Sequence, residues 1–140
     1  MEILVHKGNH EIGGTCIQVT SGMTTILLDV GLPLSAESVH VDVSRLKVDA
    51  VLVSHPHRDH FGLMDRLLQG TSVYIGELGK NLIDVTNVLL GKERHGNNFR
   101  HFKAWEPFWI GDFKITPYLV DHSATDAYSF LIEAEGKRLF

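Results

Sequence analysis

The sequence Ser54-His55-Pro56-His57-Arg58-Asp59-His60 places four groups that can bind a metal ion within six residues. It directly follows residues 49–53, an apolar run that predicts a strand. In an extended segment, side chains two residues apart point the same way, so His55, His57 and Asp59 can converge on one point. The last histidine can join them if the chain turns into a helix there. Imidazole and carboxylate together suit zinc or a similar divalent ion.

The alternative interpretation of this run is a histidine-rich surface turn. The ordered spacing HxHxDH is far more specific than a composition rich in histidine, and it favours the metal site.

Composition limits the class of protein. With 140 residues the chain forms one domain or part of one, and 44% apolar with 21% charged residues is ordinary for a globular protein. The net charge of −4 gives no overall electrostatic attraction for nucleic acid, so a polyanion would be held by the metal and by local Lys or Arg.

The single cysteine, Cys16, lies in an alternating strand-like segment and is expected to be a buried structural thiol rather than a nucleophile. No apolar run approaches the length of a membrane span, and no secretory signal opens the chain. We therefore expect a cytoplasmic protein without membrane contact.

The residue pattern predicts an α+β fold. A hairpin is expected around the turn Ser21-Gly22-Met23, and apolar residues repeat at helical spacing in residues 61–68 and 77–90. The expected strands are residues 1–6, 16–20, 24–30, 49–53, 71–75, 113–119, 128–134 and 137–140. This order predicts a sheet with helices on its outer face.

Residues 92–103 are polar and mildly basic, with interleaved aromatic side chains. We expect a solvated connection there. The alternative is a rim that contacts phosphates, because basic and aromatic groups together suit single-stranded nucleic acid.

Two further residues are candidates for the same site. His122 lies in a polar loop after an apolar strand, and it is the candidate third ligand because a catalytic zinc uses three protein ligands plus water. Asp29 follows the apolar end of an earlier strand, where a carboxylate is costly to bury unless it is paired. Asp29 therefore has two interpretations on sequence alone: it caps a turn, or it takes part in the site.

These features resemble the metallo-β-lactamase fold superfamily. The resemblance rests on Leu27-Leu28-Asp29-Val30-Gly31, on His55-Pro56-His57-Arg58-Asp59-His60, and on His122 after a later strand. The glycine-rich residues 8–14 and the segment 121–128 are similar to the ribonuclease J and β-CASP branch. The resemblance implies an αββα sandwich, in which two sheets pack face to face with helices outside.

The resemblance also implies roles for individual residues. His55, His57 and His122 would hold a first divalent ion, with zinc expected and manganese or iron as alternatives. Asp59 and His60 would hold a second, and Asp59 would also take a proton. Asp29 would steady the loop rather than bind metal.

The chain departs from the family pattern at its end. A carboxylate that bridges the two ions normally follows a further strand, and no such residue follows Lys137-Arg138-Leu139-Phe140. We therefore expect residues 1–140 to form a partial domain, the N-terminal portion of a longer enzyme. An uncovered sheet face and an unpaired strand edge would then favour self-association.

Three functions remain open on this sequence. The first is a ribonuclease J-like phosphodiesterase that acts on RNA through two metal ions. The second is a small-molecule metallohydrolase of glyoxalase II or lactamase type. The third is a non-catalytic metal-binding fragment.

Overall fold

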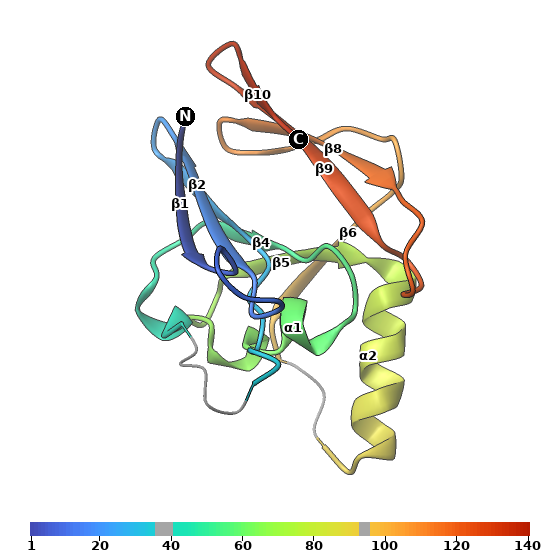
Figure 1. The fold of residues 1–140 in the computed structure, drawn as a ribbon. Helices are drawn as coiled ribbons and strands as arrows, with labels where there is room; N and C mark the ends of the chain where they lie inside the picture. The colour runs from blue at the N-terminus through green and yellow to red at the C-terminus, as the bar shows by residue number, and fades with distance from the viewer. Residues whose placement is uncertain (36–40, 93–95) are drawn as a thin grey trace.

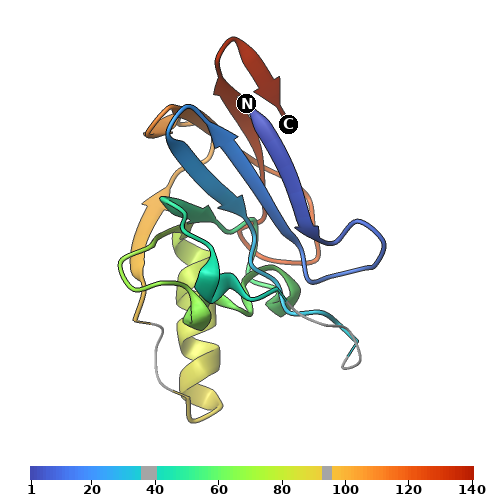
Figure 2. The same cartoon turned by 90° about the vertical axis from the view of Figure 1, so that its left-hand side faces the viewer.

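The computed structural model describes residues 1–35, 41–92 and 96–140, and in these residues two β-sheets pack face to face (Figures 1 and 2). The first sheet has the order β1-β2-β3-β4-β5-β6: β1 Glu2–Lys7, β2 Cys16–Ser21, β3 Thr24–Leu28, β4 Ala50–Leu52, β5 Ser72–Gly76 and β6 Asn98–Phe102. The second has the order β10-β9-β8-β7: β7 Phe108–Ile110, β8 Phe113–Leu119, β9 Tyr128–Ala134 and β10 Lys137–Leu139. The predicted α+β architecture with two stacked sheets is confirmed.

The direction of the strands fixes where a site can form. Strands β1, β2 and β3 pair antiparallel, whereas β3, β4, β5 and β6 run parallel. Parallel strands end at one edge of the sheet, and ligand sites of such sheets form outside those carboxyl ends. Asp29, Ser54 and the start of α2 (Glu77–Leu89) all follow strands at this edge.

Helices cover the outer face of the first sheet, and α2 packs against β5. Two 3₁₀ turns, Val43–Arg45 and Met64–Arg66, complete this layer. Within the described residues, no helix covers the outer face of the second sheet, so one of the two expected helical layers is present. None of the helices described here is long and apolar enough to cross a membrane.

The helix expected over residues 61–68 is much shorter, because α1 spans only Arg58–Phe61. The Leu63 amide donates to the carbonyl of Val30 at 2.8 Å instead of continuing the helical ladder. The Asp59 carbonyl accepts instead from the amide of Thr15 at 3.2 Å. Contacts with the preceding loops therefore end the helix after one turn.

Two apolar cores hold the layers together. One lies between the first sheet and its helices, and its fully buried members include Leu27, Val51 and Met64. The other lies between the two sheets and is built from both of them, with Ile26, Phe113 and Ile132 among its buried residues.

The expectation of a solvated connection over residues 92–103 is wrong for part of that stretch. Residues 98–102 form β6, which pairs parallel with β5, while residues 93–95 lie outside the described part. Phe99 packs against one core and Phe102 is buried in the other. The apolar partners of these two rings, distant in sequence, turn a polar segment into an edge strand.

Candidate metal centre

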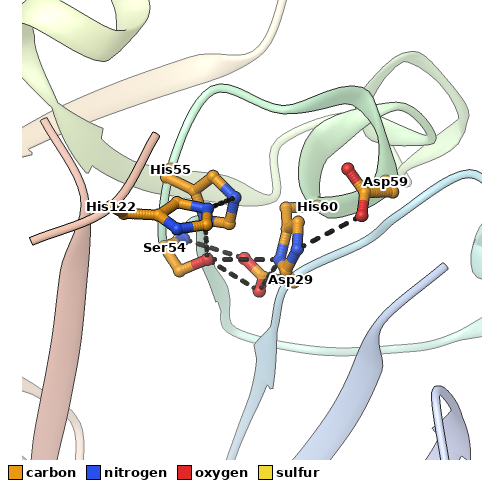
Figure 3. A network of polar contacts seen from close by, with 6 residues as sticks. All are labelled: Asp29, Ser54, His55, Asp59, His60 and His122. Carbon is orange, nitrogen blue, oxygen red and sulfur yellow. Dashed lines mark hydrogen bonds and ion pairs between the residues drawn. The ribbon is translucent and has the colours of Figure 1, made fainter. Parts of the chain in front are cut away.

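Three histidines, from loops that follow strands of the two sheets, come together at the carboxyl edge of the first sheet. His55 and His57 follow β4, and His122 lies in the loop that joins β8 to β9. One ring nitrogen of each lies within 4.8 Å of the others. The Nε2 atoms of His55 and His122 face each other at 3.2 Å, as Figure 3 shows.

The distance between the nitrogens of His55 and His122 fits two ligands of one divalent ion. Zinc–imidazole bonds of about 2.0–2.1 Å in a tetrahedron put two ligand nitrogens about 3.3 Å apart. The 3.2 Å between His55 and His122 matches that edge. A set of neutral imidazoles is also the donor chemistry that zinc and similar ions accept. The residues present therefore fit a divalent metal ion.

Asp29 lies beneath the histidines and organises them (Figure 3). It follows β3 with a φ of 60°, a left-handed conformation that Asp tolerates better than most residues, and its side chain is buried. Its Oδ1 accepts the backbone amide of Ser54 at 2.8 Å. Its Oδ2 accepts the Ser54 hydroxyl at 2.9 Å and Nδ1 of His60 at 2.7 Å. Asp29 thus contacts the loop and the helix that carry the predicted ligands.

These hydrogen bonds fix the protonation of His55. A carboxylate only accepts, so the one hydroxyl proton of Ser54 points to Asp29. Ser54 Oγ lies 2.9 Å from Nδ1 of His55 and, with its proton used, accepts a hydrogen bond from that nitrogen. The lone pair of His55 is therefore on Nε2, the atom that faces His122.

Burial, together with the neighbouring imidazoles of His60, His122 and His57, lowers the pKa of His55 to about 4, against a smaller opposing effect of the Asp59 charge. His55 is thus uncharged at neutral pH, the form that binds metal.

His60 responds to its surroundings in the opposite way. Burial acts to lower the pKa of His60, but the hydrogen bond to Asp29 and the charges of Asp29 and Asp59 raise it overall.

The predicted second pair of ligands, Asp59 and His60, lies on α1 beside the triad. Asp59 Oδ2 is 3.5 Å from Nε2 of His60, and the rings of His60 and His55 have centroids 3.9 Å apart. The other nitrogen of His60 is occupied by Asp29. Among the described residues, the close ligand cluster contains only the three histidines, so Asp59 and His60 are adjacent to it rather than part of it.

Two glycines lie close to Asp59 on α1: Gly13, within the glycine-rich residues 8–14, and Gly31. A Cβ at Gly13 would lie 3.1 Å from Oδ2 of Asp59, and one at Gly31 would lie 1.7 Å from the carbonyl oxygen of Asp59. These two glycines let loop backbone approach the ligand-bearing turn closely.

Sequence reasoning missed three contributors to the site. Ser54 belongs to the motif, and its place between a buried strand and His55 could have indicated that its hydroxyl contacts the predicted ligand. Asp126 and Tyr128 hold the loop that carries His122, through contacts with α2 and with Ser54. Because Gly79, the partner of Asp126 on α2, is 47 positions away, no local pattern could have identified this contact.

Two curated relatives have sequences similar to most or part of this chain. "Ribonuclease J" of Mycoplasma genitalium is 24% identical over 146 residues, covering 94% of this chain and 26% of the relative. "Probable RNase MJ4" of Methanocaldococcus jannaschii is 37% identical over 90 residues, covering 61% of this chain and 21% of the relative. The chain thus spans about a quarter or less of the length of these curated relatives.

Among solved structures, a protein of unknown function from Enterococcus faecalis superimposes with a TM-score of 0.80 at 20% identity. The match covers 97% of this chain and 41% of that one, and it shows the shared fold. Residues 24–140 match the sequence family described as the beta-lactamase superfamily domain. This match extends over most of the chain and includes every predicted ligand, and the chain accordingly belongs to the beta-lactamase superfamily.

Proposed function

We propose that residues 1–140 form the metal-binding part of a metal-dependent hydrolase that cleaves RNA phosphodiesters. The observation that carries the proposal is the convergence of three histidine nitrogens within 4.8 Å, with a hydrogen-bonded network that turns a lone pair of His55 toward His122. His55, His57 and His122 would hold the first divalent ion, with zinc the expected metal. Asp59 and His60 would hold a second.

The second pair has a feature that supports this assignment. Asp59 Oδ2 faces Nε2 of His60 at 3.5 Å, while Nδ1 of His60 donates to Asp29. If His60 is neutral, two acceptors face each other. Either a proton on Nε2 or a metal ion between them would satisfy both, because each supplies the missing positive charge.

When bound, a divalent ion makes a hydroxide nucleophile available near neutral pH and neutralises charge on a phosphodiester. The chain's own residues would do the rest. Asp59 would orient the attacking water and accept its proton. Asp29 and Ser54 would keep His55 and His60 in one orientation, so that the ligands need no rearrangement before the reaction.

RNA is the proposed substrate for two reasons. The curated relatives described above are named as ribonucleases. In addition, Arg58 is exposed in the first turn of α1, between His57 and Asp59, where a guanidinium can contact a phosphate. In a chain with a net charge of −4, such local cations would have to provide the attraction for RNA.

The test is hydrolysis of single-stranded RNA by the protein with zinc or manganese added, beside a His57→Ala control. We expect cleavage that a chelator abolishes and that the variant lacks. Turnover of a β-lactam or of a glutathione thioester without RNA cleavage would assign the site to a small-molecule hydrolase. Metal binding without turnover of any of these substrates would leave a non-catalytic metal-binding chain.

A further inference from the structure

The loop that carries His122 is attached to the amino end of α2 by one side chain. Asp126 Oδ2 accepts the backbone amide of Gly79 at 2.8 Å. Gly79 is in the first turn of α2, where backbone amides lack partners within the helix, and Gly76 at the N-cap has no side chain to serve them. Asp126 therefore caps α2 from a distant loop, and Figure 1 shows that loop against the upper end of the helix.

The fit around this carboxylate is close. A Cβ at Gly76 would lie 2.1 Å from Oδ2 of Asp126, so a side chain at position 76 would displace the carboxylate. A Cβ at Gly79 would be 3.5 Å from both the carboxylate and the ring of Pro56. The first turn of α2 thus lies against the His122 loop and against the residue between His55 and His57.

The other end of the loop is also held. The Tyr128 hydroxyl donates to Oδ1 of Asp126 at 2.6 Å, and burial, followed by this hydrogen bond, raises the pKa of Tyr128. The Tyr128 amide donates to the carbonyl of Ser54 at 2.9 Å, and the Val120 amide closes the loop on the carbonyl of Ala127 at 3.0 Å. These anchors lie at the two ends of the loop, while His122 is exposed between them.

We infer that Asp126 is a positioning residue that holds His122 at the metal centre by fastening the 120–127 loop to the amino end of α2. The inference rests on the proposed metal site. His55 and His57 follow a buried strand of the first sheet, whereas His122 lies in the loop that joins β8 to β9 of the second sheet. Asp126 ties that loop to α2, which packs against β5 of the first sheet, so it fixes the distance between the third nitrogen and the other two.

Asp126 also has the right backbone for this position. Its φ is 65°, a conformation that Asp and Asn adopt more readily than other residues with a side chain. Asn at this position also tolerates the positive φ and keeps one acceptor oxygen. Ala tolerates the positive φ less well and has no side-chain acceptor. Asn is therefore the conservative variant, and the difference between the two substitutions measures the side-chain contact together with the backbone preference.

The experiment uses four single variants and one double variant, with zinc affinity and amide hydrogen exchange as the two readouts. Asp126→Ala removes the cap, Asp126→Asn retains most of it, and Gly76→Ala displaces the carboxylate from the helix side. Asp121→Asn is the matched control, because Asp121 is an exposed carboxylate in the same loop. Zinc affinity is measured by competition with a chromophoric chelator, and amide hydrogen exchange of residues 120–128 is measured on metal-free protein. Thermal unfolding confirms that each variant is folded at the temperature used.

We expect Asp126→Ala and Gly76→Ala each to weaken zinc binding by about 10- to 100-fold, the usual effect of losing a residue that orients a ligand. Both should speed exchange at Val120 and Tyr128, and Asp126→Asn should do less of each. The double variant, which combines Gly76→Ala with Asp126→Ala, should bind zinc no worse than Asp126→Ala alone, because the clash at position 76 disappears with the carboxylate. Asp121→Asn should change neither readout.

Unchanged zinc affinity in Asp126→Ala would overturn the inference, even if exchange in the loop increased. Additive losses in the double variant would also overturn it, because the two residues would then act separately. If the wild-type protein bound no zinc, the proposed function would fail. Hydrogen exchange in the metal-free variants would still support or overturn the fastening of the loop by Asp126.

Discussion

Asp29 illustrates how one buried residue organises a site without being one of its ligands. Its two oxygens accept three hydrogen bonds, two from Ser54 and one from His60. Through Ser54 it determines which nitrogen of His55 carries the proton, and through its direct contact it does the same for His60. Its position after β3 gives it access to both the loop and the helix.

Replacing Asp29 by Asn tests this role at the residue scale. Asn has nearly the same shape and tolerates the positive φ, but its amide group cannot accept all three hydrogen bonds. We expect zinc affinity to fall by about 10- to 100-fold. Chelator competition measures the change.

Asp49→Asn is the matched control. Asp49 also accepts a backbone amide, from Thr25, but it lies at the start of β4, at the other end of the strand from the site. Equal zinc affinity in the Asp29 variant and the wild type would show that the network does not orient the ligands.

The buried thiol of Cys16 should make the stability of the protein depend on pH. Its thiol is fully buried, and burial, with a smaller contribution from the charge of Asp29, raises its pKa from 9.0 to about 12. The folded state keeps the proton that the unfolded state loses above pH 9, so this residue's contribution to stability is lost as pH rises from 9 to 12. Each pH unit costs about 1.4 kcal/mol.

Denaturant unfolding between pH 8 and 11 measures this effect as the difference between the wild type and Cys16→Ala. The free energy of unfolding of the wild type should fall more steeply with pH than that of the variant. Parallel pH profiles for the two proteins would contradict the assignment of a buried, protonated thiol.

At the scale of elements, the turn that carries Asp59 and His60 is held by loops rather than by its own length. Helix α1 has one turn, and Val30 and Leu32 donate their amides to carbonyls of His60 and Arg58 at 2.8 and 3.0 Å. The loop backbone reaches these carbonyls because Gly31 has no side chain. The geometry of the second pair of predicted ligands therefore depends on loop backbone.

Gly31→Ala should disrupt this contact. The added Cβ would lie 1.7 Å from the carbonyl oxygen of Asp59, and both groups belong to backbone that cannot move aside easily. We expect a loss of about 3 kcal/mol in the free energy of unfolding, as in other overpacked sites. Gly96→Ala is the control, since a Cβ there meets nothing within 4 Å. Equal stability of the two variants would show that the loop can retreat from α1.

Sequence patterns predicted those elements whose burial is periodic. Strands β8 and β9 have the predicted bounds, and α2 ends one residue earlier than expected, because alternating and helical apolar patterns mark their buried faces. Strand β6 was missed and α1 overestimated, because packing partners and backbone bonds distant in sequence decide both.

In the candidate site, too, local patterns predicted some residues, whereas contacts distant in sequence were missed. The motif and the spacing brought His55, His57 and His122 under consideration, and the structure brings their nitrogens together. The roles of these residues as ligands stay predictions. Asp126 lies in the segment 121–128 that the sequence singled out, but its contact with α2 was missed because its hydrogen-bond partner, Gly79, is 47 positions away.

On the scale of the whole molecule, one side of the sandwich presents apolar surface. Ile3 and Val5 of β1, half exposed, line a cavity of about 270 Å³ together with Phe140. Strand β1 is an edge of its sheet and pairs only with β2 among the described strands. One antiparallel register of two copies of β1 pairs Glu2 of one copy with Lys7 of the other, which joins opposite charges.

We therefore predict that the chain self-associates through β1. Multi-angle light scattering after size exclusion should report a dimer, and Val5→Lys should shift it to the monomer because it places a charge in the apolar contact. Met23→Lys is the control, because Met23 is 98% exposed in the turn between β2 and β3. A monomer at high concentration, or a dimer that survives Val5→Lys, would exclude this interface.

The central claim is that three histidines from the two sheets form one metal centre. Elemental analysis of the purified protein, after equilibration with zinc and removal of excess metal, tests it most directly. We predict at least one zinc ion per chain in the wild type and its loss in both His57→Ala and His122→Ala, with each variant shown to be folded. A wild-type protein without metal, or a His122→Ala variant that keeps the full amount, would contradict the account.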